Sequence, residues 1–189
     1  MSTNFRENIM VKHSKIALVS VVMISLSVYT PVLRAEDYIA RAGDVLQYAL
    51  PATAVGLIIA HDDGDGAIQF ASSAALTVAV TYALKFGINA RRPNGGNHSF
   101  PSGHTSISFS AAEFMRNRYG IEYGAPAYAL ASFVGYSRVE SDNHYIRDVV
   151  AGAGIGALSS LLFTTPYEDW NVSVNGDAKS IGVRLGHQF

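Results

Sequence analysis

The chain has 189 residues and a formal net charge of −1, with 49% hydrophobic and 15% charged residues. This balance argues against a general nucleic-acid binder, which needs a broad basic face. The absence of cysteine excludes disulfides, thiolate chemistry and cysteine-ligated zinc. The length fits one domain with a sizeable core, and nothing in the sequence indicates an oligomeric state.

The first 35 residues have the order of an export signal. Lys12 and Lys15 precede an apolar run over residues 16–29, and Ala35 stands just before the acidic residue Glu36. The run is short for a membrane span, which needs about 20 residues. We therefore expect residues 1–35 to be either a cleaved signal peptide or a retained membrane anchor, and the protein to be exported.

The next part of the chain predicts an all-α domain over residues 36–165. Five helical stretches follow one another, at residues 38–60, 67–88, 103–119, 125–136 and 145–163. A retained N-terminal segment would add a sixth helix to this bundle. Asp44, near the start of the first stretch, is expected to be solvated or to cap the helix.

Charged residues, glycines and an acidic turn indicate how these helices are placed and connected. The third stretch is short and carries Glu113, Arg116 and Arg118, so it is a poor membrane span. Gly152 and Gly156, one turn apart in the fifth stretch, predict close helix packing. The acidic turn at residues 61–66 is expected to be a surface loop, because the later ligands of a calcium loop are missing.

Residues 166–189 change in character. Residues 170–174 alternate between apolar and polar, as do residues 181–185, and Asn175-Gly176 is a typical hairpin turn. We expect a short C-terminal β-hairpin or an extended tail.

Three cations stand out in this weakly charged chain. Lys85 and Arg138 lie near the ends of apolar stretches, and Arg92 follows in the loop before the third stretch. Three such charges at one site would match a phosphate group, and arginine can hold two of its oxygens at once. They would also stabilise charge on the equatorial oxygens during phosphoryl transfer.

A second block, Pro101-Ser102-Gly103-His104, marks a loop that enters a helix. Ser102 can cap that helix, and Gly103 lets the backbone approach a ligand closely. The free N–H groups of the first turn would point at an anion.

The third block joins Arg138 to His144 and Asp148. His144 and Asp148 are four residues apart, so they share a face if both are helical. The carboxylate can then hold one imidazole nitrogen while the other attacks phosphorus. A second histidine must protonate the departing oxygen, and His104 is the candidate.

In this order and spacing, the three blocks resemble the signature of the phosphatidic acid phosphatase type 2 (PAP2) and haloperoxidase superfamily, over residues 85–148. The resemblance implies a PAP2-type helical bundle and metal-independent hydrolysis through a phosphohistidine. It implies His144 as nucleophile, His104 as general acid and Asp148 as the partner that orients His144. The residues that it implies for phosphate binding are Lys85, Arg92, Arg138, Ser102 and Gly103.

The expected substrate is a phosphorylated membrane lipid, at the periplasmic face of a bacterial membrane. Phosphatidic acid, phosphatidylglycerol phosphate, undecaprenyl diphosphate and lipid A are the candidates, with vanadate as a phosphate-mimicking inhibitor and no cofactor. The nearest alternative is a soluble periplasmic acid phosphatase that acts on small esters. A vanadium-dependent haloperoxidase and a non-catalytic envelope protein are the remaining alternatives, since a fold alone does not fix a function.

Overall fold

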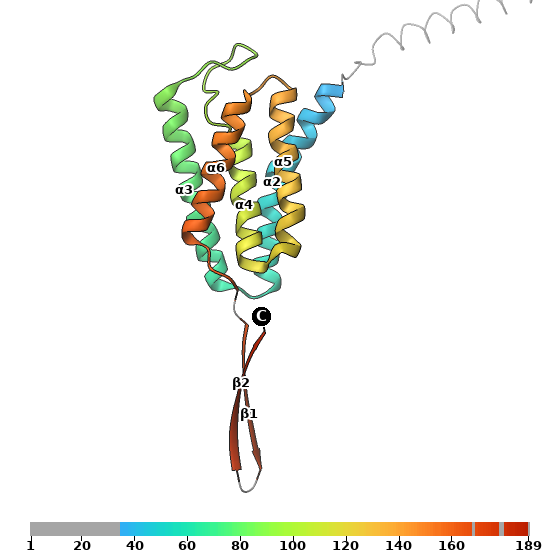
Figure 1. Cartoon of the computed structure of the whole chain (residues 1–189), viewed down its shortest axis with the longest axis vertical. Coiled ribbons are helices and arrows are strands. Elements are labelled where there is room, and N and C mark those ends of the chain that lie inside the picture. The colour runs from blue at the N-terminus through green and yellow to red at the C-terminus, as the bar shows by residue number, and fades with distance from the viewer. Residues whose placement is uncertain (1–34, 168, 178–179, 189) are drawn as a thin grey trace, which may run out of the picture. The chain divides into compact units, whose positions relative to one another are not determined.

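The computed structural model describes residues 35–167, 169–177 and 180–188. Residues 1–34, which hold nearly all of the expected signal peptide or anchor, lie outside the described residues. The described part contains five helices and a two-stranded sheet (Figure 1). The helices are α2 (Ala35–Ala60), α3 (Gly64–Ile88), α4 (Gly103–Tyr119), α5 (Ile121–Glu140) and α6 (Ile146–Phe163). The prediction of an all-α bundle is confirmed.

Helix α4 packs against α3, α5 and α6, and it supplies much of the core. Its buried apolar residues include Ala111, Ala112, Phe114 and Met115, which cluster with Leu50 and other residues of α2 and α5. The short, charged helix that fits a membrane poorly by itself is thus enclosed by the other helices.

Small residues allow α6 to lie close to α4. A Cβ atom added at Gly152 would come within 2.5 Å of the Ser102 carbonyl oxygen, and one added at Gly156 within 2.1 Å of the Ser106 carbonyl oxygen. Such contacts are far too short for a side chain. The predicted packing role of both glycines is confirmed, and it is typical of helices that associate inside membranes.

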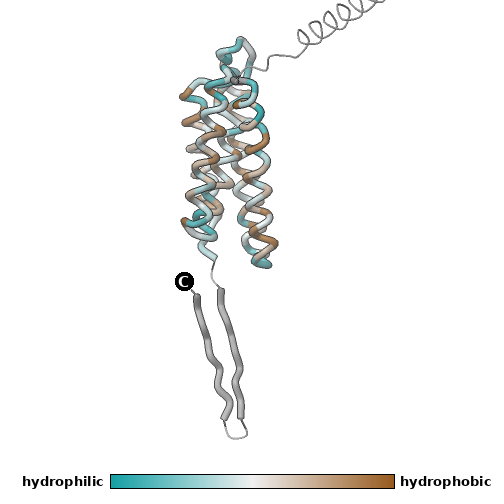
Figure 2. Tube along the Cα trace, turned by 90° about the vertical axis from the view of Figure 1, so that its right-hand side faces the viewer, coloured by the Kyte–Doolittle hydropathy of each residue, from teal (hydrophilic) through white to brown (hydrophobic). Residues whose placement is uncertain are grey.

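Hydroxyl pairs join α3 to α4 along the same core. Thr77 Oγ1 donates to Ser110 Oγ at 3.1 Å, and Thr81 Oγ1 donates to Ser106 Oγ at 3.0 Å. Outside the bundle, large apolar side chains are exposed on α2, α3 and α6. Among the described residues, three helical segments are long and apolar enough to cross a membrane, namely Asp37–Ala60, Gly64–Ile88 and Ile146–Phe163 (Figure 2).

The expected surface loop at residues 61–66 is shorter than predicted, because residues 64–66 already belong to α3 and Asp63 turns inward. Asp63 is buried, and its Oδ1 caps α3 by accepting the Gly66 N–H at 2.8 Å. Its carboxylate also pairs with the guanidinium of Arg118 at 2.5 and 2.7 Å and accepts the Tyr119 hydroxyl at 2.8 Å. This buried cap starts α3 three residues earlier than the sequence predicts, and it anchors the far end of α4.

Strands β1 (Asp169–Asp177) and β2 (Ser180–Gln188) pair in antiparallel register, with Val174 opposite Val183. Asn175 and Gly176, expected at the turn, lie within β1, opposite Gly182 and Ile181. The predicted turn position is therefore wrong, because pairing continues past Gly176 to Asp177 and Ser180.

Candidate active site

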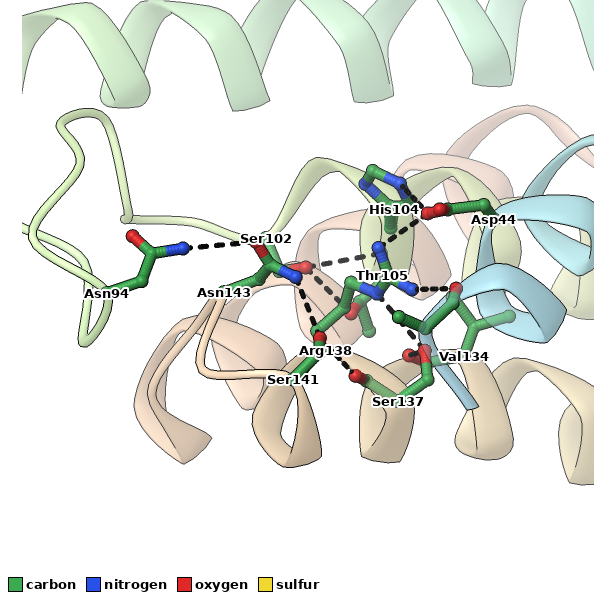
Figure 3. Close-up of polar contacts among 11 residues, drawn as sticks. Asp44, Asn94, Ser102, His104, Thr105, Val134, Ser137, Arg138, Ser141 and Asn143 are labelled. Carbon is green, nitrogen blue, oxygen red and sulfur yellow. Dashed lines mark hydrogen bonds and ion pairs between the residues drawn. The ribbon is translucent and has the colours of Figure 1, made fainter. Parts of the chain in front are cut away.

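Two loops meet at the end of the bundle where α4 and α6 begin. The backbone N–H of Asn94 donates to the Asp142 carbonyl at 3.1 Å. The side-chain amide of Asn94 donates to Asn143 Oδ1 at 3.3 Å (Figure 3). Nearby, the Ser102 N–H donates to the Asp148 carbonyl at 2.9 Å. These bonds fix the three sequence blocks relative to one another.

Lys85 and Arg92 bring positive charge to this end. The ammonium of Lys85 is nearly buried and donates to the carbonyls of His98 and Pro101 at 2.8 and 2.9 Å. Since an ammonium has three donors, one remains for a ligand. Arg92 Nε donates to the Asn97 carbonyl at 3.1 Å, and within the described residues the other guanidinium N–H groups stay available.

Ser102 caps α4, as predicted. Its buried Oγ accepts the Thr105 N–H at 3.4 Å and the Thr105 hydroxyl at 2.9 Å. The hydroxyl therefore serves the start of the helix, whereas the neighbouring Gly103 lies on the cavity wall.

His104 and Arg138 converge on one carboxylate, that of Asp44 (Figure 3). Asp44 Oδ1 lies 3.1 Å from His104 Nε2 and 2.6 Å from an Nη atom of Arg138. Arg138 is 4% exposed, and it also donates to the Ala40 carbonyl at 2.5 Å and to Ser137 Oγ at 3.1 Å. Three hydrogen bonds of the Arg138 guanidinium are thus made to residues of α2 and α5.

Three charged neighbours influence the protonation of His104. Burial lowers the pKa of its imidazole below the usual range, and the positive charges of Arg138 and Arg92 act in the same direction. The negative charge and hydrogen bond of Asp44 oppose this shift. Asp44 therefore favours the protonated form that a general acid requires.

His144 and Asp148 come together in a different way from the one that the spacing suggests. Helix α6 begins at Ile146, so His144 lies in the preceding loop and only Asp148 is helical. The expectation of a shared helical face is wrong, but His144 Nδ1 still lies 3.7 Å from Asp148 Oδ2. Both side chains are buried, and in the described part of the chain His144 Nδ1 and Asp148 Oδ1 lack a hydrogen-bond partner.

The surroundings of His144 favour its neutral form, and hydrogen bonds hold the Asp148 carboxylate in place. Burial lowers the pKa of His144, helped by the charges of Arg92 and Lys85 and opposed by Asp148. A neutral imidazole retains a lone pair that can attack phosphorus. Asp148 Oδ2 accepts the Ser99 hydroxyl at 2.5 Å and the Tyr145 N–H at 3.0 Å, so the carboxylate is held from two sides.

A cavity of about 510 Å³ joins several of these groups. The predicted site residues that line it are Lys85, Arg92, Gly103, His104 and His144. Ser102, Arg138 and Asp148 lie behind this wall, fully or almost fully buried. Two imidazoles and two cations around one cavity can bind a phosphate group and transfer its phosphoryl part.

Comparisons with known proteins agree with this arrangement. The model of the PAP2 superfamily matches residues 94–171, a range that begins after Lys85 and Arg92. A lipid A 1-phosphatase of Helicobacter pylori (strain J99) is 31% identical over 140 residues, which cover 69% of this chain and 70% of the relative. The chain belongs to the PAP2 superfamily. This PAP2 protein is accordingly a phosphoric ester hydrolase, and its apolar helices fit a membrane protein.

Two further matches extend the comparison. A lipid A 4'-phosphatase of the same organism is 31% identical over 150 residues, which cover 73% of this PAP2 chain and 75% of the relative. The crystal structure of LpxE from Aquifex aeolicus shares the fold, with a TM-score of 0.59 and 22% identity. That match covers 70% of this chain and 85% of the solved one.

Sequence reasoning missed two polar residues of this PAP2 site. Asp44 was expected to be solvated or capping, yet it bonds both His104 and Arg138. No local pattern singles out Ser99, whose buried hydroxyl donates to Asp148. The sequence does carry a signal for Asp44, because it is a charged residue within a largely apolar helix, as Lys85 is.

Proposed function

We propose that this protein removes a phosphate group from lipid A or a closely similar membrane lipid, at the periplasmic face of the membrane. The observation that carries the proposal is the cavity that joins His104 and His144 to two cations, between helices with exposed apolar faces. The lipid A phosphatases among the relatives support this choice within the lipid-phosphate class. One of these relatives is a 1-phosphatase of lipid A and the other a 4'-phosphatase. Analysis of the reaction product therefore has to identify which phosphate of lipid A this protein removes.

In the proposed first step, His144 attacks phosphorus through Nε2. A P–N bond forms, the P–O bond to the lipid breaks, and His104 gives its proton to the departing oxygen. Asp148 stabilises the positive charge that develops on His144, and the N–H groups of Lys85 and Arg92 hold the phosphate oxygens. Arg138 contributes its charge from behind His104.

The second step returns the protein to its starting state. Water enters where the lipid oxygen left, and His104 takes a proton from it. The water oxygen attacks phosphorus, the P–N bond breaks, and inorganic phosphate leaves. These steps use side chains of this chain alone, and no metal ion or other cofactor is part of the proposal.

The direct test is phosphate release by the purified full chain and its His144→Ala variant. The panel is lipid A, phosphatidic acid, phosphatidylglycerol phosphate, undecaprenyl diphosphate and p-nitrophenyl phosphate. We expect release from lipid A that the variant loses, with mass spectrometry of the product identifying the phosphate removed. Release from p-nitrophenyl phosphate alone would contradict a lipid substrate, and activity retained by the variant would contradict the nucleophile.

The intermediate and the membrane face need separate measurements. Rapid quenching with ³²P-labelled substrate should trap label on the protein in an acid-labile, base-stable form, as expected of a phosphohistidine, and His144→Ala should abolish it. In intact cells, a thiol reagent that does not cross the inner membrane should modify a cysteine introduced at the exposed residue Asn97. Protection of that cysteine until the inner membrane is opened would contradict the periplasmic face.

A further inference from the structure

Residues 98–101 wrap around the ammonium of Lys85 and supply two of its hydrogen-bond partners. The carbonyls of His98 and Pro101 accept from Lys85 Nζ at 2.8 and 2.9 Å. Lys85 also lines the active-site cavity, so its third N–H is the one that can reach a ligand there. The direction of that N–H therefore depends on where these two carbonyls lie.

The side chain of His98 fastens this segment to the helix that carries Lys85. Its Nδ1 lies 3.1 Å from the carbonyl oxygen of Lys85, in the last turn of α3. A carbonyl oxygen only accepts hydrogen bonds, so Nδ1 carries a proton and donates it. A histidine that bonds a carbonyl in the last turn of a helix fixes the helix end. Lys85 and His98 are thus bonded twice, the side chain of each to the backbone carbonyl of the other.

Two further features restrain the half-buried ring of His98. It meets the ring of Phe86 edge to face, with the centroids 5.0 Å apart. The backbone of His98 has a φ of +58°, in the left-handed region, where histidine is found more often than most residues. In this conformation the ring and the carbonyl of one residue both reach Lys85.

The ring has no direct place in the proposed mechanism. His98 does not line the cavity that holds His104 and His144, so its effect on the substrate has to pass through Lys85. The next residue, Ser99, donates to Asp148 at 2.5 Å. One short segment is therefore bonded both to a phosphate-binding cation and to the partner of the nucleophile.

We infer that His98 is a positioning residue, whose ring holds the segment that directs the ammonium of Lys85 at the phosphate group of the substrate. The inference rests on the proposed function, in which Lys85 holds phosphate oxygens. Without the bond from His98 Nδ1, the carbonyls that orient the ammonium are free to move. The bound phosphate then loses part of its bond to Lys85.

The test compares His98→Gly with His98→Asn. Both variants lack the ring and tolerate the left-handed backbone, but the amide nitrogen of asparagine takes the place of Nδ1 and still donates to the Lys85 carbonyl. The readout is the dissociation constant of vanadate, measured by calorimetry on the purified full chain. We expect His98→Gly to weaken binding about tenfold, because a bond from a charged donor is misdirected, and His98→Asn to stay within about twofold of the wild type.

Asn89→Gly is the matched control. Asn89 is exposed, has a φ of +46° and follows α3 directly, and it lies outside the active-site cavity. The variant therefore adds the same backbone freedom near Lys85 without removing the bond from His98. We expect wild-type affinity for vanadate, and a loss equal to that of His98→Gly would overturn the role of the ring.

A double-mutant cycle with Lys85→Met separates positioning from a structural role. If His98 acts through Lys85, His98→Gly weakens vanadate binding no further in the Lys85→Met protein. Wild-type affinity in His98→Gly, or an equal loss in both backgrounds, overturns the positioning role and leaves the phosphatase standing. Wild-type affinity in Lys85→Met overturns the phosphate-binding role of Lys85 instead. A wild-type protein that neither binds vanadate nor releases phosphate contradicts the proposed function itself.

The wild-type protein offers an independent measurement should His98→Gly misfold. NMR of protein labelled with ¹⁵N-histidine, with the His98 signals assigned from their loss in His98→Asn, should show a proton on Nδ1. An Nδ1 without a proton would overturn the inference, because the ring could not then donate to the Lys85 carbonyl.

Discussion

Asp44→Asn isolates the charge that lies between His104 and Arg138. The substitution keeps the size of the side chain and one oxygen acceptor, so both neighbours retain a polar partner. It removes the negative charge that lies 3.1 Å from His104 Nε2 and 2.6 Å from the Arg138 guanidinium. The variant therefore tests the carboxylate as an electrostatic positioning group.

The expected size of the effect follows from the two contacts. A hydrogen bond to a charged group contributes about 1.5 to 3 kcal/mol, and about 1.4 kcal/mol corresponds to a tenfold change in rate. The Asp44 side chain is 49% exposed, so solvent screens it and the lower end of this range applies. We expect kcat/KM to fall about tenfold at neutral pH.

The pH profile distinguishes this electrostatic role from a merely structural one. His104 is surrounded by Asp44 from α2, Arg138 from α5 and Arg92 from the loop before α4, and Asp44 raises its pKa against the two arginines and burial. Without the carboxylate, the pKa of His104 falls further, so the protonated acid is lost at a lower pH. The alkaline limb of kcat/KM should move to lower pH, and the loss of activity should shrink as pH falls.

The assay is the pH dependence of kcat/KM with p-nitrophenyl phosphate, for the wild type, Asp44→Asn and Asp65→Asn. Asp65 is an exposed carboxylate in the first turn of α3, at the other end of that helix from Lys85, so it controls for the loss of one negative charge. An equal loss of activity by Asp44→Asn at every pH, with the limb unmoved, would refute the electrostatic argument.

Four further predictions concern the phosphate site, the mechanism and the packing. Arg138→Met should weaken inhibition by vanadate about tenfold or more, measured with p-nitrophenyl phosphate, because a charged donor near the site is lost; unchanged inhibition would place Arg138 outside the binding site. Arg118→Met should lower the free energy of unfolding by about 3 to 5 kcal/mol, because Asp63 would stay buried and unpaired; wild-type stability in denaturant titrations would contradict this. Gly156→Ala should lower the free energy of unfolding by about 1 to 3 kcal/mol, because the added methyl group pushes α6 away from α4. Gly154→Ala, with open space around it, should lower the free energy of unfolding far less, and equal losses in denaturant titrations would contradict the packing argument. A chelator should leave phosphate release unchanged, and inhibition that a divalent ion reverses would contradict the proposed mechanism.

The sequence predicts which segments are helical better than it predicts where each helix begins and ends. The structure extends α5 from the expected 125–136 to Ile121–Glu140. Arg138 lies just beyond the apolar stretch, so the local sequence places the end of the helix before it. Arg138 stays within the helix because its guanidinium bonds Asp44 and the Ala40 carbonyl of α2, and the local sequence carries no information on that partner.

In the candidate site, too, the sequence predicts local features well and contacts between distant residues poorly. Residues near one another in the chain, such as Ser102 and the helix that it caps, follow from local rules. The contact between His144 and Asp148 was expected for the wrong reason, because the loop rather than the helix brings His144 to the carboxylate. The contacts of Asp44 with His104 join residues 60 apart, which spacing alone could not indicate.

On α3 and α6, buried polar and small residues recur every four positions, and this repeat determines both how the helices pack and where the site lies. On α3 the buried residues include Ser73, Thr77, Thr81 and Lys85, and on α6 they include Asp148, Gly152, Gly156 and Ser160. Both sets recur every four residues, so each is a stripe along one helix face. In a soluble bundle such a stripe would be apolar, but here the polar and small residues face inward while large apolar residues such as Ile68, Phe86 and Leu162 are exposed. The inversion fits a bilayer, where close contact and hydrogen bonds hold helices together instead of the hydrophobic effect. Because Lys85 ends one stripe and Asp148 begins the other, the repeat that packs α3 and α6 around α4 also turns both charged residues toward the same end of the core.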